Sequence, residues 1–267
     1  MNSLELTAIA AGVVFALFTL TWWLSLRLNN FSFVDITWSY SLAFIAPTYA
    51  WFGAGGGVRK GLALGIALVW SLRLGTYLLM RIVRHHPHED VRYAVLREKW
   101  KSNLARNFFG FFQAQAALIL LLSAPILIAC QNPAKDLGVT EIVGAVVWAI
   151  GIVGEAVSDA QMNAFKRDPA NRGKVCQAGL WRYSRHPNYF FEFVVWVGFW
   201  LFACGSPWGW VTIYAPALIL YFLLRVTGIP LTEECAVKSK GEAYREYQRT
   251  TNAFVPWLPR SAKAGRG

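Results

Sequence analysis

The chain has 267 residues, of which 55% are hydrophobic and only 15% are charged. Soluble globular domains carry about 25% charged residues, and a run of roughly 20 apolar residues is long enough to cross a ~30 Å hydrocarbon core. Such runs recur along this sequence, which excludes a soluble domain, a disordered chain and a secreted disulfide scaffold. The net charge of +11 would suit nucleic acid, but membrane proteins collect basic residues in cytoplasmic loops. We therefore expect an all-α, polytopic membrane protein with no nucleic-acid partner.

Seven apolar runs are predicted to form transmembrane helices, and connections that contain Gly, Asn and Pro separate them. No positive charge precedes the first run and Glu5 lies before it, so it does not resemble a cleaved signal peptide. No repeat or linker divides the sequence, which predicts one membrane domain over residues 1–267. In chain order, the predicted spans are Leu6–Leu26, Phe31–Phe52, Gly61–Met80, Asn107–Cys130, Ile142–Asn163, Tyr189–Ala203 and Trp210–Ile229.

The distribution of basic residues predicts that the N-terminus lies outside and the C-terminus inside. With this orientation, 21 of the 26 lysines and arginines fall in cytoplasmic segments, in agreement with the positive-inside rule. These 21 are Arg27, seven residues from Arg81 to Arg106, six from Lys166 to Arg185 and seven from Lys238 to Arg266. The others are Arg59, Lys60 and Lys135 outside, and Arg73 and Arg225 within spans.

Six ionisable side chains fall within the predicted spans. Each costs about 2.5–3.5 kcal/mol at the centre of a membrane helix, so these groups must face one another, water or a ligand. All except one lie toward the predicted cytoplasmic ends of their helices, which predicts a polar cavity open to the cytoplasm. A set of interhelical salt bridges is the alternative. The six residues are Asp35, Arg73, Glu155, Asp159, Glu192 and Arg225.

The segment that follows the fifth predicted span is rich in groups that bind phosphates. Lys166, Arg167 and Arg172 come first, and the hydroxyls of Ser184 and Tyr189 follow. Clustered cations with hydroxyl donors suit an anionic, phosphate-bearing ligand. The alternative is that these cations serve only topology or contact anionic lipid.

No metal site is expected. The four cysteines show no C-x-x-C spacing. His85, His86 and His88 lie in a segment that a proline interrupts, which makes a poor metal cage. The glycines of residues 53–57 do not fit the dinucleotide-binding pattern, so the helical bundle itself must hold any nucleotide.

Two parts of the C-terminal half resemble known families. The segment from Arg182 to Glu192, RYSRHPNYFFE, resembles the signature of the steroid 5α-reductase superfamily, and it is equally similar to that of the isoprenylcysteine carboxyl methyltransferases. The ending resembles both families through Glu233-Glu234, residues 241–247 and Val255-Pro256. The resemblance implies a cofactor-binding part over about residues 136–260 and substrate-side helices over about residues 1–135.

Three segments of the N-terminal half, at residues 32–38, 70–77 and 89–93, resemble the bacterial branch of the reductases. Members of that family use NADPH to reduce a C=C bond conjugated to a ketone. The resemblance implies that Asp159, Asn188 and Glu192 hold the nicotinamide end. It places Arg73, Tyr77 and Arg225 around the diphosphate and riboses, and Lys166, Arg167 and Arg172 at the 2′-phosphate. The remaining implied cofactor-binding residues are Tyr183, His186 and Tyr247.

The reductase family pairs a carboxylate on the second helix with a tyrosine on the third. Asp35 matches the carboxylate, but Trp70 stands where the tyrosine is expected. Trp38 lies one turn from Asp35 on the same helix face, and its indole N–H can donate a hydrogen bond. Asp35 and Trp38 are therefore the predicted catalytic residues, with Asp35 kept protonated by an apolar site as the acid itself.

The leading interpretation is an NADPH-dependent reductase of a lipophilic enone, such as a 3-oxo-Δ4 steroid, that enters from the bilayer. The alternatives are an S-adenosylmethionine-dependent membrane methyltransferase and a non-enzymatic lipid-binding or transport protein. Cations near the cofactor favour NADPH because S-adenosylmethionine has no phosphate. The resemblance to the bacterial branch favours a bacterial inner membrane with the cofactor site facing the cytoplasm. The sequence specifies no oligomeric state.

Overall fold

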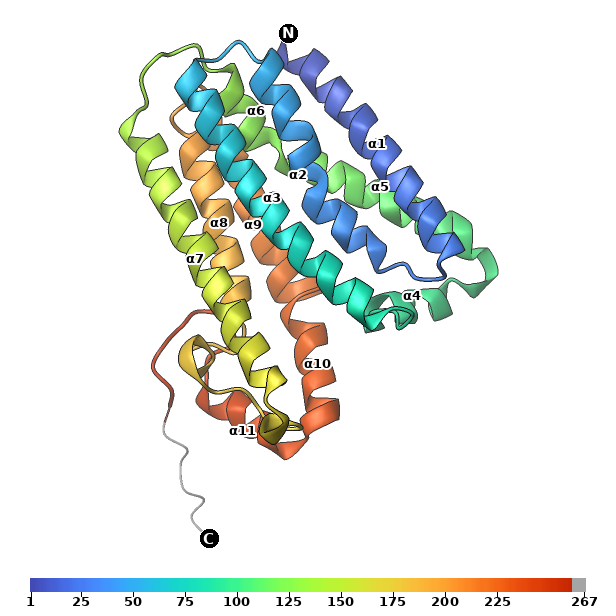
Figure 1. The fold of residues 1–267 in the computed structure, drawn as a ribbon. Helices are drawn as coiled ribbons and strands as arrows, with labels where there is room; N and C mark the ends of the chain where they lie inside the picture. The colour runs from blue at the N-terminus through green and yellow to red at the C-terminus, as the bar shows by residue number, and fades with distance from the viewer. Residues whose placement is uncertain (261–267) are drawn as a thin grey trace. The chain divides into compact units, whose positions relative to one another are not determined.

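The computed structural model describes residues 1–260, and within that range the chain is helical and contains no β-strand (Figure 1). Two of the cytoplasmic basic residues predicted above, Lys263 and Arg266, lie outside the described residues. The α-helices are α1 (Ser3–Arg27), α2 (Phe33–Phe52), α3 (Gly57–His85), α4 (Val91–Lys99), α5 (Leu104–Leu122), α6 (Ala124–Gln131), α7 (Val139–Arg167), α8 (Pro187–Ala203), α9 (Tyr214–Tyr221), α10 (Ile229–Lys240) and α11 (Glu242–Thr250).

The prediction of an all-helical chain is confirmed. Five helical segments of the described chain are long and apolar enough to cross a membrane: Ser3–Arg27, Gly57–His85, Lys101–Gln131, Val139–Arg167 and Gly209–Lys240. The shorter helices α2 and α8 lie where the second and sixth spans were predicted. The count of seven spans and the orientation stay predictions.

Two predicted spans are interrupted, and proline and glycine explain both interruptions. The fourth span divides after Leu122, because Pro125 has no N–H to continue the ladder of α5. The seventh consists of a 3-10 turn (Gly209–Ile213), α9 and a π-helical segment (Phe222–Val226), and α10 follows. A Cβ on Gly228 would lie 2.4 Å from the carbonyl oxygen of Leu223, so only glycine fits the close approach after the π-helical segment.

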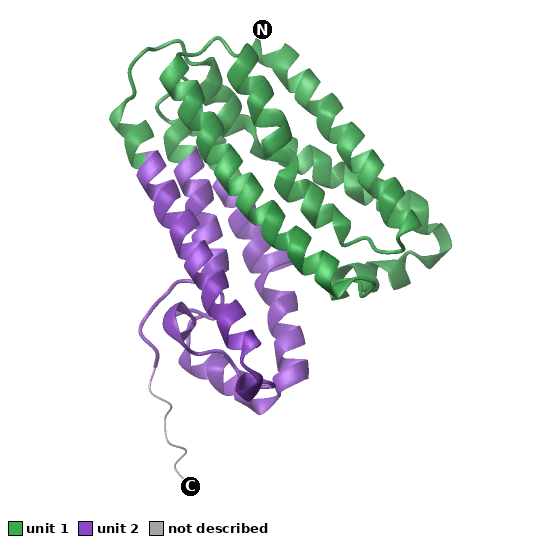
Figure 2. Ribbon diagram, in the orientation of Figure 1, with its two compact units in different colours: residues 1–143, 200–215 green, residues 144–199, 216–267 purple. Residues whose placement is uncertain are grey.

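The chain forms two compact units (Figure 2). Unit 1 comprises residues 1–143 and 200–215, and unit 2 comprises residues 144–199 and 216–267. The sequence predicted a boundary between the two parts near residue 135. It did not predict that residues 200–215 belong with the N-terminal part. The roles expected for the two parts, substrate side and cofactor side, stay predictions.

Close packing of α2 against α3 positions the candidate residues of unit 1. A Cβ on Gly75 would lie 2.7 Å from the ring of Tyr40, so a glycine lets the two helices approach. The Ser71 hydroxyl accepts from the backbone N–H of Ala43 at 3.0 Å and donates to the carbonyl of Ser39 at 2.6 Å. The Ser71 hydroxyl is therefore inserted between the N–H of Ala43 and the C=O of Ser39, which α2 would otherwise pair with each other. Side chains inserted in this way are one cause of helix kinks.

A buried ion pair within unit 1 joins the first turn of α3 to the first turn of α7. The Arg59 guanidinium pairs with Glu141, and these side chains are 1% and 0% exposed. Arg59 also donates to the carbonyls of Ala134 and, at 2.5 Å, Asp136. Arg59 was predicted only as a basic residue of an outer loop; its burial shows that it organises the segment before α7.

In unit 2, glycines bring α7 and α8 together. A Cβ on Gly154 would lie 2.2 Å from the ring of Phe191, and a Cβ on Gly198 would lie 2.5 Å from the backbone nitrogen of Trp148. Beyond these helices, the indole N–H of Trp181 donates to the carbonyl of Ser158 at 2.9 Å. The segment before α8 is thereby fixed to α7.

Candidate functional site

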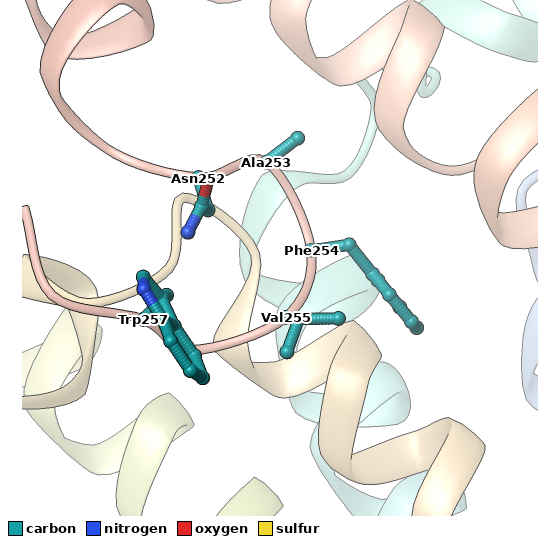
Figure 3. A pocket seen from close by; sticks show the side chains of 5 residues that line it. All are labelled: Asn252, Ala253, Phe254, Val255 and Trp257. Atoms are coloured by element: carbon teal, nitrogen blue, oxygen red, sulfur yellow. The ribbon is translucent and has the colours of Figure 1, made fainter.

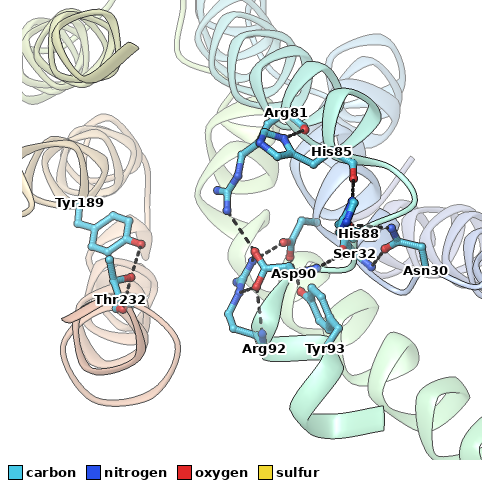
Figure 4. A network of polar contacts seen from close by, with 12 residues as sticks. Asn30, Ser32, Arg81, His85, His88, Asp90, Arg92, Tyr93, Tyr189 and Thr232 are labelled. Atoms are coloured by element: carbon cyan, nitrogen blue, oxygen red, sulfur yellow. Dashed lines mark hydrogen bonds and ion pairs between the residues drawn. The ribbon is translucent and has the colours of Figure 1, made fainter. Parts of the chain in front are cut away.

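Asp35 accepts two short hydrogen bonds from α4. Figure 4 shows the two donors, Tyr93 and Arg92, in the polar network around Asp90. The Tyr93 hydroxyl donates to Oδ1 of Asp35 at 2.5 Å, and Nη2 of Arg92 donates to Oδ2 at 2.6 Å. Both carboxylate oxygens thus have a donor, one neutral and one cationic. A charge-assisted hydrogen bond such as the one from Arg92 is short and strong.

Local capping places Tyr93 and Arg92. The Asp90 side chain accepts from the backbone N–H of Arg92 at 3.1 Å and so caps α4. The Asp90 N–H in turn donates to the Ser32 hydroxyl at 2.9 Å, and the Phe31 N–H donates to Glu89 at 2.6 Å. The segment before α4 is therefore joined to the start of α2, which carries Asp35.

The charges around α4 shift two of its pKa values. Burial raises the pKa of Tyr93 well above its ordinary 10.0, and the charge of Asp35 raises it further while Arg92 lowers it. Tyr93 therefore keeps its proton and acts as a donor. Burial also acts to raise the pKa of Asp90, but hydrogen bonds and charge from Arg92, together with Arg81, hold it below the ordinary 3.8.

Trp38 lies one turn after Asp35 on α2. Its ring contacts Trp70 edge to face, with centroids 5.9 Å apart. The Trp38 indole nitrogen is buried and has no hydrogen-bond partner among residues 1–260. Trp70, at the position where a tyrosine was expected, is fully buried in unit 1. The hydroxyl that reaches Asp35 comes instead from Tyr93, which the sequence reasoning did not single out.

The remaining candidate residues of unit 1 are Arg73 and Tyr77, one turn apart on α3 and both half-buried. At this spacing, the two side chains lie on one face of α3. The structure thus brings an aspartate, a phenol and an arginine into contact at α2 and α4. Arg73 and Tyr77 lie on α3 of the same unit.

Unit 2 carries buried carboxylates on α7. Glu155 and Asp159 are one turn apart and only 4% and 6% exposed. On α8, the Glu192 carboxylate accepts from the indole N–H of Trp196 at 2.8 Å, and Asn188 is half-buried one turn earlier. The buried acidic groups predicted from the sequence are therefore real features of these helices.

The signature segment anchors the end of the chain. Nε of Arg185 donates to Glu233 of α10 at 2.6 Å, and Nε2 of His186 lies 3.2 Å from the same carboxylate oxygen. The Tyr247 hydroxyl donates to the carbonyl of Trp181 and, at 3.2 Å, to that of Ser184. His186 and Tyr247 were predicted to bind cofactor, and here both contact other protein groups. Glu233, which receives both Arg185 and His186, was not among the predicted site residues.

The predicted phosphate ligands of unit 2 are exposed. Lys166 and Arg167 end α7, and Arg172 follows a 3-10 turn. Arg225 is exposed within the π-helical segment, and Tyr183 is 38% exposed. Residues 1–260 contain no group of three or more His, Cys, Asp or Glu side chains arranged to hold a metal ion.

A family model described as "Protein of unknown function (DUF1295)" matches residues 21–251, which include both units' candidate residues. The chain belongs to the DUF1295 family. This DUF1295 chain is 29% identical over 117 residues to the probable O-methyltransferase ustE of Ustilaginoidea virens, a match that covers 43% of the chain and only 39% of that relative. It is 26% identical over 271 residues to the uncharacterized protein C594.04c of Schizosaccharomyces pombe, covering 91% of the chain and 78% of that relative. No solved structure matches it significantly.

Proposed function

We propose that this chain is an NADPH-dependent reductase of the conjugated C=C bond of a lipophilic enone, such as a 3-oxo-Δ4 steroid that becomes its 5α-dihydro product. One observation carries the proposal: the Tyr93 hydroxyl is held 2.5 Å from the Asp35 carboxylate. A phenol that keeps its proton beside a carboxylate is a suitable donor for a carbonyl oxygen that gains negative charge.

The residues of unit 1 supply the proton chemistry of this proposal. When bound, NADPH supplies the hydride for the β-carbon of the enone, and the charge passes to the carbonyl oxygen as an enolate. Tyr93 turns its proton from Asp35 to that oxygen, and Arg92 keeps neutralising Asp35. As the resulting enol becomes the ketone, its α-carbon takes a proton from water and its O–H proton returns to Tyr93. Arg92 also lies over the Tyr93 ring, with Cζ 5.2 Å from the centroid, where its charge offsets that of a tyrosinate. The indole N–H of Trp38 is a further donor for the same oxygen.

The donor set of unit 2 fits a nicotinamide cofactor. Lys166, Arg167 and Arg172 are exposed cations that suit the 2′-phosphate. The buried Asp159 and the half-buried Asn188 offer acceptors for a carboxamide. In this proposal Glu192 completes the nicotinamide end, and Arg225 binds the diphosphate and riboses. Arg73 and Tyr77, which lie in unit 1, keep the role toward the diphosphate and riboses that the family resemblance implies.

In this proposal the substrate reaches the protein from the lipid bilayer. Five long apolar segments are consistent with an integral, multi-pass protein. We propose that a flat apolar enone enters from the bilayer, that the cofactor binds from the cytoplasm, and that the host is a bacterial inner membrane. An apolar helix bundle excludes water from the developing enolate, which strengthens each hydrogen bond to it.

An S-adenosylmethionine-dependent methyltransferase of a lipophilic substrate is the second candidate. The similarity to a probable O-methyltransferase favours it. The buried carboxylates of Glu155 and Asp159 also suit the cationic sulfonium and ammonium groups of that cofactor. Under this candidate, Lys166, Arg167 and Arg172 have no phosphate to bind.

Cofactor identity decides between the candidates. Detergent-purified protein is heated with NADPH, NADH or S-adenosylmethionine, and ligands released from the purified protein are identified by mass spectrometry. A ligand at about 100 times its dissociation constant stabilises by about 2.7 kcal/mol, which a thermal shift detects. Stabilisation by NADPH alone supports the reductase, and a screen of steroid enones for NADPH oxidation follows. Stabilisation by S-adenosylmethionine alone overturns it and leaves the methyltransferase.

A further inference from the structure

The end of the described chain, residues 251–260, runs as a non-helical strap along the signature segment. The Arg185 N–H donates to the carbonyl of Asn252 at 2.9 Å, and the Trp257 N–H donates to the carbonyl of Tyr183 at 2.9 Å. Between these bonds, the Ser184 hydroxyl donates to the carbonyl of Phe254 at 2.7 Å. The strap therefore has a fixed position in unit 2.

The side chains of the strap divide into two sets. Phe254 packs on the first turns of α8, with ring centroids 5.6 Å from Phe190 and 6.0 Å from Phe193. Val255, Trp257 and Leu258 point away from the core and are 51%, 67% and 72% exposed. An open hollow of about 310 Å³ lies along the strap, and Figure 3 shows Trp257 and Val255 beside it. Three large apolar side chains are thus exposed within a short stretch of the strap.

The position of Phe254 on α8 indicates the depth at which this apolar surface lies. The residues before α8 are polar and charged, whereas α8 is apolar from Phe190 onward except for Glu192. A helix that passes from polar to apolar residues in this way marks the boundary between headgroups and acyl chains. Because Phe254 contacts the first two turns of α8, the exposed residues of the strap lie at that boundary.

The charges near the strap suit the same environment. Arg260 ends the described strap and Arg182 begins the signature segment, and both side chains are exposed. Tryptophan is enriched at membrane interfaces, and arginines there are attracted to anionic headgroups. Pro256 and Pro259, on either side of Trp257 and Leu258, restrict the backbone and keep the strap extended.

We propose that the strap is an interfacial anchor whose Val255, Trp257 and Leu258 side chains insert at the headgroup–acyl boundary of the bilayer. Arg182 and Arg260 then face lipid phosphates. Since the backbone of the strap is bonded to Tyr183 and Arg185, contact with lipid also stabilises the signature segment. This anchor is independent of which cofactor the chain binds.

Site-specific fluorescence tests the anchor. Cys235 is the exposed native cysteine, so Leu258→Cys is made in a Cys235→Ser chain, labelled with bimane and placed in nanodiscs of phosphatidylcholine and phosphatidylglycerol. Ala243→Cys, on the charged face of α11, is the control, and the Cys235→Ser chain gives the background. We expect lipids that carry a doxyl group near the head of the acyl chain to quench the Leu258 label several-fold more than the control. Aqueous iodide should quench it several-fold less.

Two outcomes overturn the proposal. If iodide quenches both labels equally and doxyl lipid quenches neither, the strap lies in water. If the Leu258 label is protected from both quenchers, protein covers the strap instead of lipid. Trp257→Cys provides a second label position if the Leu258 variant does not fold, and the same two quenchers then decide.

Discussion

The hydroxyl of Tyr93 donates to Asp35 from a helix that begins 56 residues later in the chain, and it is the shorter of the two hydrogen bonds that this carboxylate accepts from α4. The pairing assigns the two groups different tasks. In the proposed reaction, Tyr93 would carry the proton and Asp35 would orient the phenol.

We expect Tyr93→Phe to lower turnover of an enone by on the order of 10²–10⁴-fold, the contribution of a positioned general acid. NADPH binding should stay within about a factor of two, since the ring remains in place. Tyr40→Phe is the matched control, because it removes another phenol, one whose hydroxyl lies 2.8 Å from that of Thr76. Single-turnover NADPH oxidation and a thermal shift separate the two effects. Full turnover by Tyr93→Phe would exclude the phenol as the proton donor.

The same site predicts a distinct result for Asp35→Asn. The amide is similar in shape but carries no charge, so Arg92 keeps only the Asp90 carboxylate as a charged partner. One of the two acceptor oxygens becomes an NH2 donor, so the amide can no longer accept from both Tyr93 and Arg92. We expect turnover to fall while the thermal shift with NADPH is retained. Equal loss of turnover and of the NADPH-induced thermal shift would point to a folding defect, which circular dichroism of the purified variant reveals.

Removing one member of the buried Arg59–Glu141 pair should destabilise the protein strongly. Arg59→Met leaves a carboxylate uncompensated in an environment where it is fully buried, which costs about 3–5 kcal/mol. The double variant Arg59→Met/Glu141→Leu should recover part of this loss. Lys135→Ala, at an exposed cation of the neighbouring loop, is the control and should be nearly neutral. Denaturant unfolding in detergent measures the free energy of unfolding of all three variants. If Arg59→Met left this free energy unchanged, the pair would not be important for stability.

Stability should fall in acid through Asp90. Because its folded-state pKa lies below the ordinary 3.8, Asp90 contributes stability above the unfolded pKa and loses it as the pH falls through the folded value. Asp90→Asn keeps a good helix cap for α4 but removes the charge. The melting temperatures of the wild type and this variant should therefore differ at neutral pH and converge as the pH approaches the folded pKa. A constant difference across that range would show that Asp90 acts only as a cap.

The exposed cations at and beyond the end of α7 predict a cofactor preference if the chain is a reductase. Changing Lys166, Arg167 and Arg172 together to Gln should raise the KM for NADPH far more than that for NADH, because only NADPH carries the 2′-phosphate. A matched control changes Lys238 and Arg245 to Gln, since both are exposed in the same unit. Equal effects on the two cofactors would remove the three cations from the phosphate site.

Hydropathy alone predicts the all-helical class and most helix positions, because the length of an apolar run carries that information. It does not reveal the break at Ser123 or the π-helical segment, since a proline or glycine within an apolar run barely alters its mean hydropathy. The short helix α4 was missed for a related reason: residues 81–106 show no apolar run, so they were assigned to a loop.

The partners of charged residues were harder to predict than the residues themselves. The sequence identifies Asp35, Glu155 and Asp159 as costly charges within spans, but pairing depends on tertiary packing. The capping pattern at Asp90, followed by Tyr93 three residues later, was the available signal for α4. Arg59 had no such signal, because a basic residue in an outer loop looks the same whether it is exposed or buried.

The Ser71 hydroxyl has a mechanical consequence for Asp35. The N–H of Ala43 is bonded to Ser71, and its carbonyl faces Pro47, which has no N–H to donate. Two backbone hydrogen bonds of α2, the one that Ala43 donates and the one that it would accept, therefore depart from the usual helical pattern. Ser71 of α3 accepts the first. The half of α2 that carries Asp35 is therefore joined to the other half partly through a side chain of α3.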